Sequence, residues 1–578
     1  MRSVLALGAL LCTLAAARAA ATTLAEEATS TGHGYRDASG TAEGRTHGDL
    51  RIFTRSGVLK PSFGYAPVDV VLHNTGPVPL QVRLSFQGHS VSGTRTSSRT
   101  VEVAPRQRLV TWLPVPASLH GGQLTVEAPG LEPLTMSVYL DALSTGTVLV
   151  LGTLKDFDDT SGVSRVEPSD NPRFAVRAID PRDAPRELAA YVGYSVVMVP
   201  GDTAAVPADV WAALEAYAAS GGRVVLARPS GDVSERLPLF TPAVTGAAAP
   251  YGFGRVRVCG AAPECAQALN AMVGEAREGP VKPVGPASRW ERGNLLVDGL
   301  TPLLAGARAP VGRFLLLIFA FVLAVGPGSL MLARRQGPVA VLVAVPLVSV
   351  VTCMALIAWS VLVDGFSVHS ARYSLTWLDS GRSRAVTLGV AAWYANVSSG
   401  PVRFPVMSAL VAQQASDEAL VDLDWTNGLT VVDGFLPPRT YREWGEVAVL
   451  PSRARLLVRR EGGTVRVQNA LGARLESGYI RVGDQLHALP VLEDGAEGAL
   501  GEVLPEGWMP VSEVLSSEGG SLAQGRLSGR EEHFRAPLPE GGFIARLGGV
   551  GMAPSSTVDM ELEAGIHVVR GQTEEVRP

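Results

Sequence analysis

The chain has 578 residues, which corresponds to about three or four domains at roughly 150 residues each. Charged residues make up 18% and apolar residues 46%, a composition that excludes a charged disordered chain and a coiled coil. Lys and Arg number 50 against 55 Asp and Glu, so the chain lacks the basic excess of nucleic-acid-binding proteins. We therefore expect no nucleic acid partner.

The N-terminus has the pattern of a secretory signal. Arg2 precedes an apolar run over 4–17, and small residues in an A-x-A pattern come next at 17–21. Residues 1–21 are predicted to be a signal peptide, with an uncleaved anchor as the alternative, and either one exports the chain beyond it. Residues 22–48 are small, polar and turn-rich, which predicts a flexible linker.

Short alternating runs characterise residues 49–143. The runs over 69–72 and 80–86, separated by a turn at 74–76, have the spacing of a small β-sandwich. The opening at 65–76 resembles immunoglobulin-like domains of bacterial envelope proteins. The resemblance implies a module that acts as a spacer or a binding surface, and it implies no chemistry.

Alternating strands and helices characterise residues 146–305. Buried strands are predicted over 147–152, 173–179, 195–201 and 223–227, and helices over 185–191 and 207–220. Helices between apolar, β-branched strands favour a parallel sheet covered on both faces.

The run YSVVMVPGDTAAVPADVWAALEAYAASGGRVVLA, which begins at Tyr194, resembles the core of class I glutamine amidotransferase-like domains. The glycine-led strand at 251–256 and the apolar span ending in Gly326-Pro327 are similar to bacterial two-span membrane proteins of unknown function. The resemblance implies a flavodoxin-like domain tethered to a membrane, with no implied activity.

The catalytic residues of that class are absent from residues 146–305. Amidotransferases use a Cys on a strand-to-helix elbow with a His base. No histidine lies between His120 and His369, and neither Cys259 nor Cys265 sits in such an elbow. We therefore predict no catalytic residue here, and we predict that the two cysteines form a local disulfide, with free or metal-binding thiols as the alternative.

Polar loops at the carboxyl ends of the predicted strands are the candidate ligand-binding positions. They place Asp156, Asp158, Asp202 and Ser230 where open α/β sheets bind ligands. The aspartates, with Asp159, have the oxygen ligands of a hard-cation site. The competing interpretation is that these side chains are solvated turn residues. We predict a ligand site at the four positions, and we predict neither a metal nor a cofactor.

Two uncharged apolar runs, 314–333 and 339–363, are each long enough to cross a bilayer. The turn between them carries Arg334 and Arg335, which favours the cytoplasmic side. Residues 313–363 are thus predicted to be a transmembrane hairpin, with two buried core helices as the alternative. Arg308 and Arg313 flank the other end of the first run, so the orientation rests mainly on the signal peptide, which exports the residues before the hairpin. With the resemblance to bacterial two-span proteins, we expect a bacterial inner (plasma) membrane protein with both large soluble regions on the exoplasmic, periplasmic side.

Residues 366–578 again show strand-like runs separated by Gly, Asn and Pro, which predicts one or two β-sandwiches. Five tryptophans in this region are either a stacking platform or core residues: Trp377, Trp393, Trp425, Trp444 and Trp508. Asp422 and Asp424 share one face of a strand, but sequence spacing cannot show a catalytic pair across a cleft.

The fold expected is a multidomain chain of α/β plus all-β parts. The function expected is that of a non-catalytic, membrane-anchored envelope protein whose partners are the lipid bilayer and another envelope protein or a polymer. One alternative is a carboxylate-dependent hydrolase of a cell-wall polymer. Another is an accessory subunit whose hairpin packs on other spans through Gly326, Gly328 and Ser329.

Overall fold

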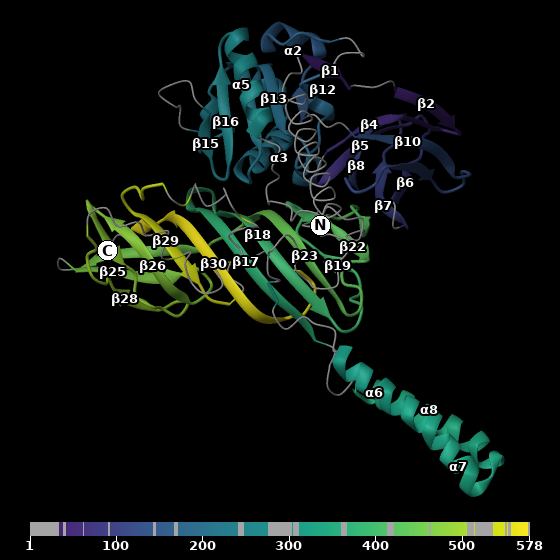
Figure 1. Ribbon diagram of the computed structural model, residues 1–578. Helices are drawn as coiled ribbons and strands as arrows, with labels where there is room; N and C mark the ends of the chain where they lie inside the picture. Colours follow the sequence, from purple (N-terminus) through teal and green to yellow (C-terminus); the bar gives the residue numbers. More distant parts are fainter. Residues whose placement is uncertain are drawn as a thin grey trace, which may run out of the picture.

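The computed structural model describes residues 34–275, 303–304, 311–359, 367–505 and 536–575 together with 514, 527 and 534, leaving out 39–41, 62, 91–92, 143–145, 167–171, 241–247, 413–420, 462–463, 550–551 and 553–555. The predicted signal peptide lies outside these residues. The chain is a multidomain protein with several sheets, one of them mostly parallel, and two long apolar helices (Figure 1).

The mostly parallel sheet has the strand order β1-β12-β11-β13-β14-β16-β15, and β15 alone among them pairs antiparallel. Its strands are β1 (Tyr35–Asp37), β11 (Gly146–Leu151), β12 (Phe174–Ile179), β13 (Val196–Asp202), β14 (Arg223–Ser230), β15 (Ala249–Tyr251) and β16 (Gly254–Cys259). The order reverses between β11 and β13, because the chain places β12 on one side of β11 and β13 on the other.

Helices cover both faces of this sheet, as the sequence predicts. The helices are α2 (Leu154–Ser161), α3 (Ala208–Ala219), α4 (Val233–Arg236) and α5 (Ala262–Glu275). Alternate residues of each strand point to opposite faces, so Val148 and Val150 pack with α2 and α5 while Leu149 and Leu151 pack on the side of α3. The predicted helix over 207–220 is α3.

The expected helix over 185–191 is wrong, because only a 3-10 turn over Leu188–Ala190 forms there. The segment is too short to extend a helix beyond its nucleating turn. Glu187, which precedes the turn, is held outside it by Arg99, whose Nη2 donates to Glu187 Oε1 at 2.7 Å.

The expected flexible linker over 22–48 is wrong for its second half. β1 adds to the edge of the parallel sheet beside β12, and β2 (Ala42–His47) pairs with β3 (Leu50–Arg55). Tyr35 is fully buried, and Arg165 Nη2 lies 3.0 Å from Asp37 Oδ2. Strand pairing, a buried aromatic ring and an ion pair thus accompany order in a segment whose composition predicts none.

Two sheets build the first β-rich region. The smaller has the order β2-β3-β5-β8 and the larger β19-β22-β21-β7-β6-β9-β10-β4. Their strands from this region are β3 (Leu50–Arg55), β4 (Gly57–Lys60), β5 (Tyr65–Asn74), β6 (Leu80–Ser90), β7 (Gly93–Val103), β8 (Arg108–Pro116), β9 (Gly121–Glu127) and β10 (Leu134–Ala142). Burial alternates along β3 and β6, as their periodicity predicts, whereas β5 is buried along most of its length.

The larger sheet also takes three strands from beyond the apolar helices. They are β19 (Val402–Arg403), β21 (Asp422–Asp424) and β22 (Thr430–Asp433). β21 pairs in parallel with β7, with Leu423 opposite Ser97 and Asp424 opposite Ser98. The expected boundary at 143 is therefore crossed, and the regions before and after the apolar helices share one sheet.

The region after the apolar helices has a large and a small sheet of its own. The large sheet has the order β20-β23-β18-β17-β30-β29-β26-β27 and the small one β28-β25-β24-β31. Their strands are β17 (Val368–Asp379), β18 (Arg384–Ala395), β20 (Ser408–Ala412), β23 (Thr440–Pro451), β24 (Arg455–Glu461), β25 (Thr464–Ala470), β26 (Leu475–Val482), β27 (Gln485–Ala488), β28 (Glu497–Ala499), β29 (Gly542–Leu547), β30 (Glu561–Gln572) and β31 (Glu574–Glu575).

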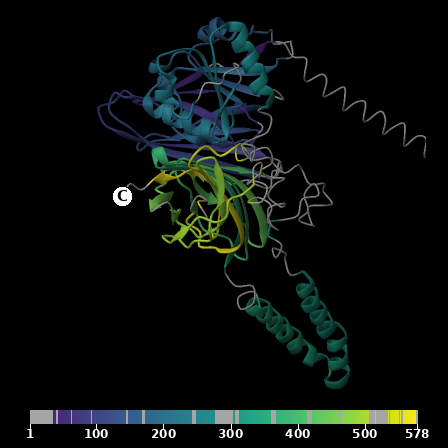
Figure 2. The same cartoon turned by 90° about the vertical axis from the view of Figure 1, so that its left-hand side faces the viewer.

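The two apolar helices project from the rest of the molecule as a hairpin (Figures 1 and 2). The first arm comprises α6 (Val311–Leu323), a π-helical turn over Ala324–Gly328 and α7 (Ser329–Gln336), and the second is α8 (Pro338–Trp359). The π-turn contains Pro327, which lacks the backbone N–H of a regular helix. Both arms are long and apolar enough to span a membrane, with mean hydropathies of 2.4 and 2.7.

Candidate functional site

The carboxyl edge of the parallel sheet brings two of the four predicted ligand residues together. Asp202 ends β13 and Ser230 ends β14, and the two residues are paired in register. Ser230 Oγ donates a hydrogen bond to Asp202 Oδ1 at 3.1 Å, and the backbone N–H of Ala204 donates to the same oxygen at 2.9 Å. The Asp202 carboxylate therefore caps a turn of its own loop.

Asp156 serves its own helix. The segment 152–164, expected to be a loop, contains α2, and Thr153 and Asp156 form a reciprocal capping box at its N-terminus. The Thr153 backbone N–H donates to Asp156 Oδ2 at 2.9 Å and its hydroxyl at 2.6 Å, and these bonds lower the pKa of the carboxyl group. The end of α2 that faces the strand reversal is thus closed by a carboxylate, which opposes anion binding there.

Asp158 ties the first strand to the sheet. The Tyr35 hydroxyl donates to Asp158 Oδ1 at 2.5 Å, and burial, helped by this bond, raises the pKa of Tyr35. In the described parts of the chain, no group of three or more His, Cys, Asp or Glu side chains has the arrangement of a metal site. Asp202 and Ser230 are hydrogen-bonded to each other, whereas Asp156 and Asp158 are bonded to Thr153 and Tyr35.

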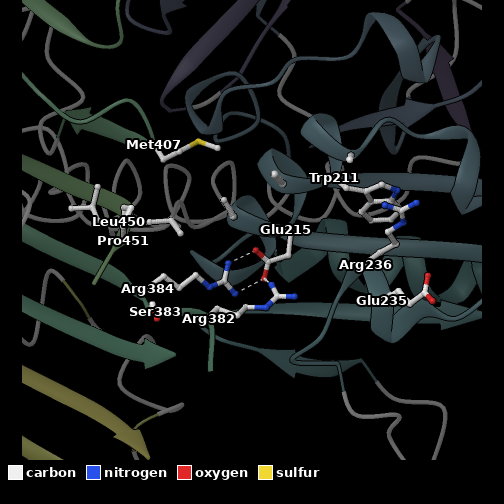
Figure 3. Close-up of a pocket in the computed structure, with 14 residues that line it drawn as sticks. Trp211, Glu215, Glu235, Arg236, Arg382, Ser383, Arg384, Met407, Leu450 and Pro451 are labelled. Carbon is white, nitrogen blue, oxygen red and sulfur yellow. Dashed lines mark hydrogen bonds and ion pairs between the residues drawn. The ribbon is translucent and has the colours of Figure 1, made fainter. Parts of the chain in front are cut away.

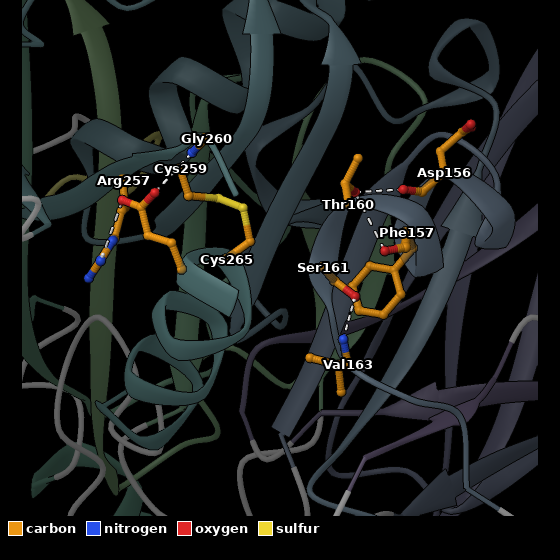
Figure 4. Close-up of a disulfide and its surroundings, with 10 residues drawn as sticks. Asp156, Phe157, Thr160, Ser161, Val163, Arg257, Cys259, Gly260 and Cys265 are labelled. Carbon is orange, nitrogen blue, oxygen red and sulfur yellow. Dashed lines mark hydrogen bonds and ion pairs between the residues drawn. A yellow bond between two sulfur atoms is a disulfide. The ribbon is translucent and has the colours of Figure 1, made fainter. Parts of the chain in front are cut away.

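The structure joins Cys259 and Cys265 in a disulfide between the end of β16 and the first turn of α5 (Figure 4). Their Cα atoms lie 5.3 Å apart, and both residues are buried in the core beneath α2 and α5. Gly162, with a φ of +67°, ends α2 beside Ala262, where a Cβ would lie 2.7 Å from the Ala262 carbonyl oxygen. The crosslink therefore fixes the turn on which α2 and α5 meet.

Replacing both Cys259 and Cys265 with alanine is expected to lower the free energy of unfolding by about 2 kcal/mol, because the short closed loop restricts the unfolded chain. Thermal unfolding of the purified protein, with and without reductant, measures this loss. The Cys353→Ser variant, which removes the exposed cysteine of α8, is the matched control and is expected to unfold like the parent. Equal stability of parent and double variant under oxidising conditions would contradict the prediction.

A pocket of about 460 Å³ lies where the α/β part meets the large sheet after the hairpin (Figure 3). α3 and α4 form one side, and the ends of β18 and β23 form the other. The lining residues are Ala208, Trp211, Ala212, Glu215, Ala216, Glu235, Arg236, Arg382, Ser383, Arg384, Met407, Val449, Leu450 and Pro451. Sequence reasoning missed this site, since no local pattern links positions so far apart.

A buried ion-pair cluster crosses the pocket. Arg384 Nη2 donates to Glu215 Oε1 at 2.6 Å and Nη1 to Oε2, while the Tyr251 hydroxyl donates to Oε1 at 2.5 Å. Arg382 Nη1 lies 3.5 Å from Glu215, and Arg384 Nε also donates to Asp379 at 2.9 Å. Glu215, only 4% exposed, is ion-paired with two arginines and accepts a hydrogen bond from a tyrosine hydroxyl, so its carboxylate is fully engaged by the protein.

Ser374 and His567, which lie on neighbouring strands of the large sheet, form a pair of the residue types used in nucleophilic catalysis. Ser374 Oγ and His567 Nδ1 are hydrogen-bonded at 2.7 Å, a spacing that nucleophile and base also adopt. The two residues are 3% and 0% exposed, so no substrate reaches them. Burial, with the nearby charge of Arg372, lowers the pKa of His567 to about 4.

The buried His567 predicts a loss of stability in mild acid. Its pKa is about 4 in the folded state against the ordinary 6.5, so below pH 6.5 the unfolded chain takes up a proton that the folded chain refuses. The free energy of unfolding should fall by up to about 3 kcal/mol between pH 6.5 and 4 from this group. Urea unfolding of the parent and of His567→Asn at several pH values should show a shallower decline for the variant. Parallel pH profiles would contradict the prediction.

The tryptophans after the hairpin do not form a stacking platform in the described residues. Trp393, Trp425 and Trp444 are buried, and the rings of Trp393 and Trp444 pack against Phe435. The guanidinium of Arg570 lies 5.8 Å above the ring of Trp377. Trp508 lies outside the described residues. Core packing therefore accounts for the buried three.

No protein-family model matches the chain, and no curated protein matches it. Among solved structures, it is similar to a cycloisomaltooligosaccharide glucanotransferase of Paenibacillus sp. (14% identity, TM-score 0.14, 28% of this chain and 20% of that chain) and to a β-glucosidase of Listeria innocua (11%, 0.11, 18% and 17%). It is also similar to the yeast δ-COP-I μ-homology domain (10%, 0.17, 37% and 98%). The chain spans about a fifth of the first two proteins, and these likenesses define no common fold or function.

Proposed function

We propose that the chain is a non-catalytic, membrane-anchored protein of the bacterial cell envelope. The hairpin anchors it in the inner (plasma) membrane, and the regions before and after the hairpin form one exoplasmic body that binds a protein partner or a polymer. The pairing of β21 with β7 carries this proposal, because strands of one sheet must lie on the same side of a membrane.

Further contacts across the hairpin support a single body. The Tyr65 hydroxyl donates to the Leu410 carbonyl at 2.9 Å, and Glu215 of α3 is paired with Arg384 of β18. Because the hairpin turn carries Arg334 and Arg335, the positive-inside tendency puts that turn in the cytoplasm and the body outside.

The finer fold assignments belong to this proposal. The central order β12-β11-β13-β14-β16 corresponds to the 2-1-3-4-5 order of flavodoxin-like sheets, which supports a flavodoxin-like α/β domain. The two sheets before it support an immunoglobulin-like sandwich that is completed by strands from beyond the hairpin. Neither fold by itself implies catalysis.

The alternative, a carboxylate-dependent hydrolase, needs two carboxyl groups in one cleft, one of them with a raised pKa. Hydrogen bonds lower the pKa of Asp156, and Glu215 is neutralised by Arg384. The surroundings of these two carboxyl groups therefore favour binding over hydrolysis.

Cysteine labelling tests the topology of the proposal. Single cysteines at Val78, Val491 and Gln336 would be introduced into a Cys353→Ser background and treated with a membrane-impermeant maleimide in intact spheroplasts. We expect labelling of Val78→Cys and Val491→Cys, which are exposed on the two sides of the hairpin, and none of Gln336→Cys at its turn. Labelling at position 78 but not at 491 would refute the single-body arrangement.

Affinity purification tests the binding role. The tagged full-length protein is isolated from membranes in mild detergent, with Trp425→Ala, which weakens the shared sheet, as the comparison. Specific co-elution that depends on an intact body supports the proposal. A hydrolase activity that copurifies and is lost on a single carboxylate substitution would overturn it.

A further inference from the structure

The pocket between α3 and the large sheet combines apolar walls with cations at its opening. Trp211, Met407, Val449 and Leu450 supply the apolar surface. The Trp211 indole N–H donates to the Thr203 carbonyl at 2.9 Å, which fixes the ring. At about 460 Å³ the pocket falls within the ~300–1,000 Å³ range of small-molecule sites.

Two of the arginines that line the pocket, Arg236 and Arg382, keep guanidinium N–H groups that other groups of the described residues do not bond. Glu215 is taken by Arg384 and Tyr251, and Arg382, 35% exposed along its side chain, reaches it only at 3.5 Å. In the part of the chain that the structure describes, Arg236 makes no hydrogen bond or ion pair through its side chain. Guanidinium donors therefore remain available on both sides of the joint (Figure 3).

The balance of charge selects an anion. Three arginines and two glutamates line the pocket, and the more deeply buried glutamate is already neutralised. With Arg382 ion-paired to Glu215 at 3.5 Å and Arg236 making no ion pair in the described residues, the pocket keeps one more cation than it has carboxylates. Because an arginine presents a planar fork of donors that fits a carboxylate, a carboxylate-bearing ligand suits the site better than a cation or a neutral sugar.

We propose that this pocket binds a small organic carboxylate with an apolar body, its charge held by the guanidinium groups of Arg236 and Arg382 and its body packed on the apolar lining, which includes Trp211 and Met407. The ligand bridges the α/β part and the large sheet, and so joins the two regions that the hairpin separates in sequence. The site goes beyond the proposed anchoring function, and it rests on the part of that proposal that puts both regions on one side of the membrane.

Calorimetric titration of the full-length protein in mild detergent tests the proposal with 2-naphthoate and with 2-naphthamide, which keeps the ring and removes the charge. We expect saturable binding of one naphthoate per chain and at least tenfold weaker binding of naphthamide. Arg236→Gln, which breaks no ion pair, should weaken naphthoate binding severalfold, and the double variant with Arg382→Gln at least tenfold. Arg83→Gln, on the exposed face of β6, is the matched control and should bind like the parent.

A second variant separates binding from folding. Ala212 is exposed on α3 and lines the pocket, so Ala212→Phe should fill the apolar wall and abolish naphthoate binding while both arginines remain. Equal affinity for naphthoate and naphthamide would overturn the proposal. Unchanged binding in the arginine and Ala212→Phe variants, or no saturable naphthoate binding by the parent, would also overturn it. None of these results would alter the labelling pattern that tests the topology.

Discussion

We expect Glu215→Ala to lower the free energy of unfolding by about 3–5 kcal/mol, a loss typical of removing one partner of a buried ion pair. The change removes the acceptor for both Nη groups of Arg384 and for the Tyr251 hydroxyl. Asp379 still accepts a hydrogen bond from Arg384 Nε. The two Nη groups lose the carboxylate of α3 that accepts from them. The charge is left buried at the joint between the α/β part and β18.

Chemical unfolding in mild detergent, followed by tryptophan fluorescence, measures the effect of Glu215→Ala. Glu235→Ala is the control, because it removes an exposed carboxylate from the same pocket and should change stability by less than about 0.5 kcal/mol. The double variant Glu215→Leu/Arg384→Leu should recover much of the loss, since an apolar pair leaves no buried charge. A Glu215→Ala loss below about 1 kcal/mol would mean that water screens the cluster.

The parallel sheet and the apolar hairpin could be predicted because their signals are local. β11, β13 and β14 are short runs of apolar, β-branched residues, and α3 follows Pro207 and ends before Gly221 and Gly222. Each of these patterns lies within one short, continuous segment, so the residues of that segment are enough to predict the element. The same holds for the uncharged runs of the two membrane-type helices.

The joins between regions could not be predicted. β1 is only three residues long, and its place beside β12 depends on the burial of Tyr35 and on Asp158, more than 100 residues away. β21 pairs with a strand over 300 residues earlier, across the whole hairpin. Three-dimensional packing determines pairing between strands so far apart in sequence. Hydrophobic periodicity predicts a strand but not its partner.

The predicted ligand residues illustrate a related limit of sequence reasoning. Asp156 and Asp202 follow strands, as ligand residues of α/β sheets do, but each accepts backbone hydrogen bonds within its own turn. The sequence cannot distinguish a carboxylate that caps a turn from one that awaits a ligand, because both favour the same loop positions. Glu215 and Arg382 meet only because α3 packs against the large sheet.

The second large effect is expected at Trp425, which follows β21 and locks the shared sheet. Its backbone N–H donates to the Ser98 carbonyl at 2.8 Å, its indole N–H to Ser97 Oγ at 3.2 Å, and its ring meets Tyr65 edge-on at 5.2 Å. With only 2% of the residue exposed, Trp425→Ala should cost about 3–5 kcal/mol through lost burial and the cavity left behind. Trp425→Phe, which keeps most of the ring area and loses the indole bond, should cost about 1 kcal/mol.

Native-state proteolysis after purification in mild detergent gives the most direct readout of Trp425→Ala, because loosening β21 uncovers β7, whose edge it covers. We expect faster cleavage on both sides of the hairpin in this variant and a smaller increase in Trp425→Phe. Val432→Ala, on the adjacent β22 and 46% exposed, is the control and should be cleaved like the parent. If Trp425→Ala accelerated cleavage only after the hairpin, the region before it would hold its fold without β21, which would contradict the prediction.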